Sequence, residues 1–252
     1  MSSNSARGFT IIEVVLFLAI TGALFAALMI GVGTGLTQQR YLGTVRSYKA
    51  LIQDQYTAVL NPANEPNGHW GCDASSGTVT QTAVSSPGAS DCIILGRAIQ
   101  ISDDGQKVTT SSVIGYQTAT SLTKETSDLT AIRDAKPTIS SFDEQDSQLD
   151  GGVTLYDRDD SYNGSDTSRM VILILRSPVS GTIRVFVWRP ASTPISSNAD
   201  VQAAIDNSPT KMKDCIDGDS GALPKEIITI DTTIASIDGV STADAGSGGC
   251  SA

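Results

Sequence analysis

The chain is poor in the side chains from which most catalytic and nucleotide-binding sites are built. It has one histidine, His69, in 252 residues, and aromatic residues make up 5% of it. A Ser-His-Asp system would have to use that histidine, and the sequence contains no G-x-S-x-G turn, P-loop, dinucleotide fingerprint or H-E-x-x-H motif. We therefore expect neither an enzyme nor a cofactor site, and we expect His69 and Trp70 to pack in a turn beside Cys72.

Basic residues are also scarce. The 17 Lys and Arg stand against 27 Asp and Glu, which gives a formal net charge of −10. A nucleic-acid-binding surface needs a basic stripe, whereas the cations here are scattered. Arg184, Arg189, Lys211 and Lys213 could form a local cluster, but they are explained equally well as the ends of strands. We predict no nucleic-acid partner.

Charge is absent altogether from Val14 to Gln39. That stretch exceeds the roughly 20 apolar residues that a helix needs to cross about 30 Å of hydrocarbon, so it predicts a membrane-spanning segment. Glu13 lies at its start, where an ionisable group is a functional candidate because charge in a membrane is costly. Alternatively, Glu13 lies at headgroup level, where a helix N-terminus favours an anion.

The order Gly8, Phe9, Thr10, Ile11, Ile12, Glu13, followed by an unbroken apolar helix, resembles the start of type IV pilins and pseudopilins. The resemblance covers some 30 residues. It implies that a prepilin peptidase cuts after Gly8, that Phe9 becomes the methylated N-terminus, and that Glu13 neutralises the terminal amine of a neighbouring subunit during assembly. Gly22 falls where many pilins carry a helix-loosening glycine, whereas Ile30 stands in place of their usual proline.

Two other kinds of N-terminal segment compete with this interpretation. A secretory signal has an apolar region of 7–15 residues and a small-residue cleavage site, and the run here is longer. A plain single-span anchor is the stronger rival. The positive-inside rule would even place the head in the cytoplasm, because Arg7 alone precedes the span and Arg40, Arg46 and Lys49 follow it.

Beyond the span the helical pattern becomes amphipathic and predicts a helix that ends near Asn61-Pro62. The stripe of Tyr41, Val45, Tyr48, Ile52 and Val59 is typical of a face buried in a core. We therefore divide the chain into a leader (1–8), the membrane-spanning half of a helix (9–36), its amphipathic half (37–60) and a β-rich head (61–252).

The head contains short, β-branched runs bounded by turn residues, a pattern typical of strands. The predicted strands are Cys92–Ile101, Lys107–Gln117, Gly152–Tyr156, Met170–Arg176, Thr182–Trp188 and Glu226–Ile237. Met170–Arg176 and Thr182–Trp188 are expected to form a central hairpin, residues 201–205 a short helix, and 73–90, 118–150 and 157–168 loops. One long helix followed by antiparallel strands predicts an α+β fold, and the resemblance implies that a sheet covers the second half of the helix.

The four cysteines, Cys72, Cys92, Cys215 and Cys250, allow three disulfide connectivities. Pairing of sequence neighbours gives Cys72–Cys92 and Cys215–Cys250, and the second pair resembles the C-terminal disulfide loop of many pilins. Their turn-like, polar flanks favour disulfides over free thiols. Because disulfides persist outside the cytoplasm, we expect the head to be extracytoplasmic despite the positive-inside count.

Two groups of aspartates are weak candidates for calcium sites, since closely spaced carboxylates can supply several of the six to eight oxygens that Ca²⁺ binds. The first group runs from Asp157, Asp159 and Asp160 to Asp166, and the second contains Asp214, Asp217 and Asp219. Neither group fits an EF-hand, and acidic solvated loops are the commoner explanation, so no metal site is predicted.

Together these features predict a structural subunit of a type IV pilus, with the large, loop-rich head favouring a minor pilin. The expected partners are other pilin subunits, the prepilin peptidase, the pilus assembly machinery and, before assembly, the membrane. The alternatives are a pseudopilin of a type II secretion or competence system, and a single-span surface binding protein. A filament would place the head at the cell surface.

Overall fold

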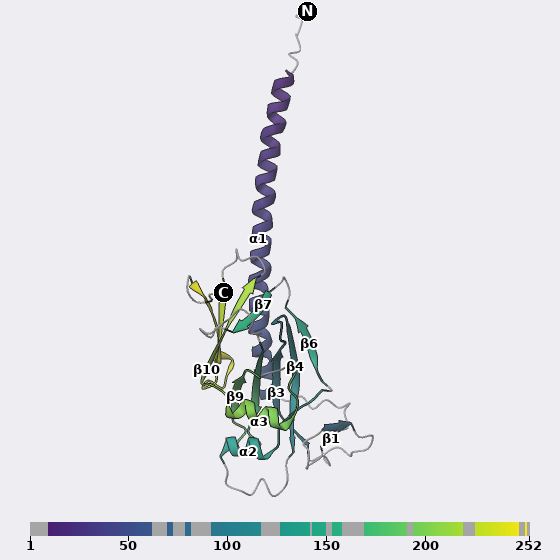
Figure 1. Cartoon of the computed structure of the whole chain (residues 1–252), viewed down its shortest axis with the longest axis vertical. Coiled ribbons are helices and arrows are strands. Elements are labelled where there is room, and N and C mark those ends of the chain that lie inside the picture. The colour runs from purple at the N-terminus through teal and green to yellow at the C-terminus, as the bar shows by residue number, and fades with distance from the viewer. Residues whose placement is uncertain are drawn as a thin grey trace, which may run out of the picture.

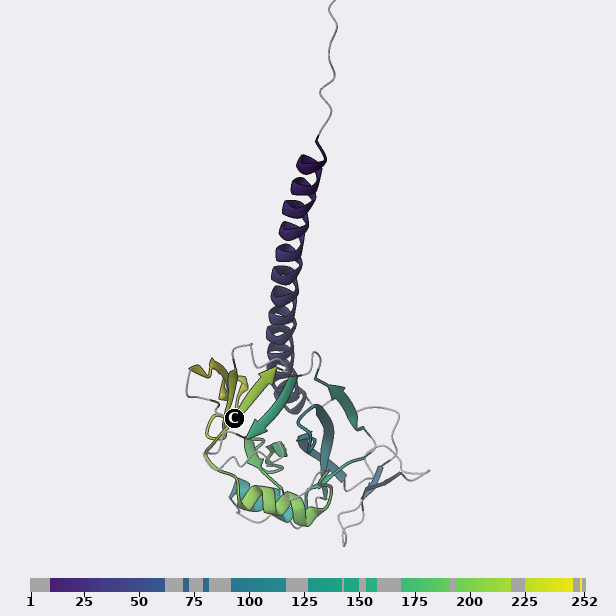
Figure 2. The same ribbon diagram turned by 45° about the horizontal axis from the view of Figure 1, so that its top comes forward.

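A computed structural model describes residues 10–61, 70–72, 79–81, 92–116, 127–141, 143–149, 153–157, 169–190, 194–218, 225–246 and 250. The chain begins with one unbroken helix, α1 (Ile11–Leu60), of 50 residues. Its first part projects from the rest of the molecule as a rod, and its second part runs into the head (Figures 1 and 2). The predicted end near Asn61 is confirmed.

The head is built around a six-stranded antiparallel sheet in the order β5-β4-β3-β8-β9, with β6 also paired to β4. The bounds are β3 (Cys92–Ile101), β4 (Lys107–Tyr116), β5 (Thr138–Ile139), β6 (Gln145–Gln148), β8 (Met170–Arg176) and β9 (Ile183–Trp188). Strand β8 lies between β3 and β9, and β8 and β9 form a hairpin. The expected hairpin is therefore confirmed, but only β8 is central, because β9 lies at the edge of the sheet.

Strand β8 reads as a continuous apolar run because both of its faces are buried. Met170, Ile172 and Ile174 face a core shared with α1. The alternate residues, Val171, Leu173 and Leu175, face a second core on the other side of the sheet. Helices α2 (Asp128–Asp134) and α3 (Asn198–Asp206) cover that second core, at the end of the head farthest from the free end of α1 (Figure 1).

A second antiparallel sheet, in the order β12-β11-β10-β7, packs beside the first. It consists of β7 (Val153–Asp157), β10 (Lys211–Gly218), β11 (Glu226–Asp231) and β12 (Val240–Asp244). One face of this sheet joins the core around α1, so the helix is held by both sheets. A short hairpin, β1 (Trp70–Cys72) with β2 (Val79–Gln81), completes the described strands. The fold is α+β, as predicted.

Several details differ from the sequence prediction. The expected strand Glu226–Ile237 ends at Asp231 and is followed by a turn and a 3₁₀ helix, η2 (Ile237–Gly239). The expected loop 118–150 contains α2, β5 and β6, and the short helix predicted at 201–205 extends from Asn198 to Asp206. Strand β7 begins and ends one residue later than expected, β4 is described to Tyr116, and β10 and β12 were not predicted.

Candidate functional site: the apolar rod and its attachment to the head

Helix α1 begins with a reciprocal cap that uses the one acid of the apolar segment. Thr10 is the N-cap residue, and its side chain accepts a hydrogen bond from the Glu13 amide at 3.4 Å. The Glu13 carboxylate in turn accepts from the Thr10 amide, also at 3.4 Å. This capping box satisfies two helix N–H groups that would otherwise lack partners. Gly8 and Phe9, the predicted processing residues, lie outside the described part of the chain.

The rod presents apolar side chains in every direction. Ile11 is 84% exposed, Leu28 66% and Leu36 50%, and every residue from 11 to 33 is exposed, so the exposed surface runs around the whole helix. By length and composition α1 is apolar enough to cross a membrane. An apolar surface of this extent is unfavourable in water, so the rod requires either lipid or other apolar helices around it.

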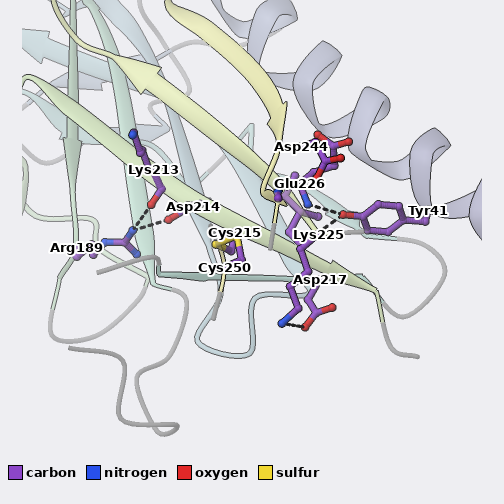
Figure 3. The surroundings of a disulfide bond; sticks show 12 residues. Tyr41, Arg189, Lys213, Asp214, Cys215, Asp217, Lys225, Glu226, Asp244 and Cys250 are labelled. Atoms are coloured by element: carbon purple, nitrogen blue, oxygen red, sulfur yellow. Dashed lines mark hydrogen bonds and ion pairs between the residues drawn. A yellow bond between two sulfur atoms is a disulfide. The ribbon is translucent and has the colours of Figure 1, made fainter. Parts of the chain in front are cut away.

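At Tyr41 the surroundings of the helix change. Tyr41 is 1% exposed, and the stripe predicted from the sequence is buried throughout, joined by Tyr56. The Tyr41 hydroxyl donates to the Ile216 carbonyl of β10 and accepts from the Glu226 amide of β11, both at 2.9 Å (Figure 3). Burial is the main cause that raises the pKa of Tyr41 above its usual value. One side chain thus ties the helix to two strands where it enters the head.

A polar network fastens the helix to the first sheet on another side. Gln55 of α1 accepts a hydrogen bond from Arg97 of β3 at 2.8 Å. Arg97 also pairs with Asp143 at 2.7 Å, and Asp143 accepts from the Ser112 amide of β4. The sequence analysis missed this network, because its members are separated by 15 to 46 positions and no local pattern connects them.

The C-terminal segment is held by a disulfide between Cys215 and Cys250 (Figure 3). Its sulfurs lie in a small core with Ile227 and Ala245. This pair was one of the connectivities left open by the sequence. Cys92 is also disulfide-bonded. The expected pairing with Cys72 falls on a side chain outside the described residues.

The second acidic group does not behave as a loop of free carboxylates. Asp214 and Asp217 lie on β10. Asp214, 2% exposed, pairs with Arg189 just beyond β9, and Asp217 pairs with Lys225 at 3.1 Å (Figure 3). Two of the three carboxylates in the second group are thus paired with cations, and Asp219 lies outside the described residues. Within the described ranges no three His, Cys, Asp or Glu side chains come together as a metal site.

The remaining candidate residues are only partly placed. Asp157 ends β7, where its backbone pairs with Asp214, whereas Asp159, Asp160, Asp219 and His69 lie outside the described residues. The possible basic cluster is divided between ion pairs, since Arg189 binds Asp214 and Lys211 binds Asp231.

Comparison with known proteins identifies no relative. No protein-family model, curated protein or solved structure matches the chain.

Proposed function

We propose that this chain is a structural subunit of a type IV pilus, a minor pilin, that is made as a single-pass membrane precursor, cleaved after Gly8 and assembled through α1. One observation carries the proposal. A single continuous helix has an exposed, apolar first half, and one face of its second half is buried in the head. Ile11, Ile12 and Glu13 of the segment that resembles pilins form the start of this helix.

The two halves of α1 have separate physical roles in the proposed assembly. The core of the head is built around the second half and, among the described residues, contains no side chain of the rod. The rod is surrounded by lipid in the precursor and by the rods of neighbouring subunits in the filament, both of which are apolar. Because the rod needs no structural change to exchange one environment for the other, assembly requires only displacement of the subunit along the membrane normal.

A second candidate function is favoured by the capping box. The bonds between Glu13 and Thr10 give the acid a partner within its own helix, so a neighbouring subunit is not needed to explain it. A single-span surface binding protein would be held by α1 and would keep its leader. A pseudopilin would share the processing and the packing of the proposed pilin, and differ in the system that it serves.

The mass of the N-terminal peptide tests the proposal. The chain is produced in cells that have a working prepilin peptidase, and the membrane and sheared-filament fractions are digested. We expect a peptide that begins with methylated Phe9, and we expect Gly8→Val to retain the leader while Ser5→Ala, three positions away, is processed normally. An intact leader on the wild-type chain in such cells contradicts the filament function and favours the single-span surface protein.

A further inference from the structure

The second half of α1 has an open face that the head does not cover. Gly43, Arg46, Ser47, Ala50 and Asp54 are exposed, while the stripe from Tyr41 to Val59 is buried. Their spacing of three and four residues puts them on one side of the helix. This open face continues the exposed surface of the rod, and three of its five side chains are small enough for another chain to approach closely.

Three cations lie on or beside the open face. They are Arg40, Arg46 and Lys49. The head pairs many of its cations with aspartates, through Arg97, Lys107, Arg133, Arg169, Arg189, Lys211 and Lys225. By contrast, no ion pair joins Arg40, Arg46 or Lys49 to an acid in the part of the chain that the structure describes. The cations of α1 are therefore available to another molecule.

A pair of carboxylates lies near the point where α1 enters the head. Glu226 of β11 and Asp244 of β12 are directly opposite each other in register, and both lie beside Tyr41 (Figure 3). Like charges in opposite positions on neighbouring strands are destabilising. Burial, and then the charge of Asp244, raise the pKa of Glu226. Asp244 accepts a hydrogen bond from the Gly246 amide, but neither carboxylate has a cationic partner among the described side chains.

We propose that the open face of α1, through Arg46 and Lys49, docks against the Glu226–Asp244 pair of a second copy of this chain. This inference rests on the proposed filament function, adds the surface and the register of the contact, and requires that at least two copies of the proposed minor pilin lie next to each other in a filament. The chain carries both the cations and the carboxylates, and no ion pair joins them within one copy among the described residues. The cations of one copy pair with the carboxylates of the other, and this pairing relieves the repulsion between the two carboxylates.

The positions of the charges set the offset between the copies. The carboxylate pair is level with Tyr41, and Arg46 and Lys49 lie five and eight residues farther along α1. At about 1.5 Å per residue, these groups meet between two parallel copies when the copy that supplies the carboxylates is displaced by about 8–12 Å along α1, in the direction from the N-terminus toward the head. The proposed contact between Glu13 and the amine of a neighbouring Phe9 requires a displacement in the same direction, because Phe9 precedes Glu13 in the sequence. The four residues from Phe9 to Glu13 correspond to about 6 Å, so the two contacts agree in direction and are similar in size.

Charge exchange in the full-length chain tests the contact. We expect Arg46→Glu and Glu226→Lys each to be largely lost from sheared filaments, and the double variant to recover because the pair is restored with its signs reversed. Lys213→Glu, which reverses an exposed cation on β10, is the matched control and should assemble normally. Resistance of the membrane-bound precursor to protease checks that each variant folds. Normal assembly of both single variants, or failure of the double variant to recover although it folds, would overturn the docking.

Cross-linking separates failure of the docking from failure of the filament function. Cysteines introduced together at positions 46 and 244 should form a disulfide between two copies in oxidised membranes, seen as a dimer on a non-reducing gel. A dimer from a chain that never enters filaments contradicts the proposed function and leaves the docking intact. If the chain enters filaments without forming the dimer, or is cross-linked only to a different protein, the docking of a second copy is wrong.

Discussion

The hydroxyl of Tyr41 donates a hydrogen bond to the backbone carbonyl of Ile216. The same oxygen accepts a hydrogen bond from the Glu226 amide, so the side chain satisfies one acceptor and one donor on adjacent strands. Tyr41→Phe leaves both backbone groups without this partner at a nearly dry site. We expect the free energy of unfolding to fall by about 1–3 kcal/mol, measured by thermal unfolding of the full chain in detergent.

Tyr56 provides the matched control for that substitution. It is as buried as Tyr41, and its pKa is raised to about 12 by burial. Its hydroxyl, however, has no hydrogen-bond partner within the described structure. Tyr56→Phe should therefore leave the unfolding temperature unchanged or raise it. Equal losses in the two variants would show that the bonds of Tyr41 do not contribute to the attachment.

Gly96 of β3 marks the place where the pairing with β4 shifts register. A Cβ atom at this position would lie 1.9 Å from the Ile174 carbonyl oxygen on β8, so the two central strands would have to separate. We expect Gly96→Ala to lower the free energy of unfolding by about 3 kcal/mol. Gly43→Ala is the control, since the added carbon would meet nothing within 4 Å beyond its chain neighbours and the backbone of its own helix, and it should stabilise the helix by about 0.5–1 kcal/mol. Similar effects of the two substitutions on chemical denaturation would contradict the close packing at Gly96.

The sequence predicted the elements whose pattern is local. Met170–Arg176 is apolar at every position but the last, and such a run predicts a strand buried on both faces whatever its neighbours are. The buried stripe of α1 was equally visible, because its period matches a helix. These elements form the core, and the α+β fold follows from them.

The elements that were missed depend on distant partners. Strand β6 is polar and fully exposed, and it forms a strand because β4 offers it an edge. In β10, Asp214 and Asp217 resemble a solvated acidic loop until their partners, Arg189 and Lys225, are known. Those partners belong to other segments of the chain, so the spacing of the aspartates in the sequence favoured an acidic loop, whereas the fold places these two on a strand and pairs them with cations.

The disulfide between Cys215 and Cys250 closes a segment separated by 35 positions. Closing a loop of this length stabilises the folded state by about 3–4 kcal/mol if the disulfide acts mainly by lowering the conformational entropy of the unfolded chain. We expect the double variant Cys215→Ala and Cys250→Ala to unfold at a lower temperature under oxidising conditions. The comparison must be made without reductant, because Cys92 is disulfide-bonded too. An unchanged unfolding temperature would mean that the C-terminal segment is held by its apolar contacts alone.

Ionisation of Glu226 should lower the free energy of unfolding of the head as the pH rises. Burial and Asp244 raise its pKa above the usual value of 4.5, so the folded chain holds this proton more tightly than the unfolded chain does. The resulting stabilisation is complete below the usual carboxyl pKa and is lost as the pH rises through the higher pKa of the folded state. Glu226→Gln cannot ionise and should unfold at a higher temperature than the wild type at neutral pH.

The difference between Glu226→Gln and the wild type should shrink as the pH is lowered through the range of carboxyl titration. Asp231 is a suitable contrast, because its hydrogen bonds with Thr233 and Lys211 lower its pKa and so give a dependence of the opposite sign. Thermal unfolding of the full chain over a pH series measures both. A constant gap between Glu226→Gln and the wild type at all pH values would show that the gain does not come from ionisation.

Glu13 can act as a helix cap, as a charge for a neighbouring subunit, or as both, and two substitutions distinguish these roles. Glu13→Gln retains the capping box, since glutamine serves at this position as well as glutamate, but it removes the charge. Thr10→Ala removes the side-chain cap and retains the charge. Under the proposed function, Glu13→Gln should remain in the membrane and be excluded from sheared filaments, whereas Thr10→Ala should still assemble. If the opposite pattern is found, the acid serves its own helix, and the neutralisation of a neighbouring amine must be abandoned even if the chain proves to be a filament subunit.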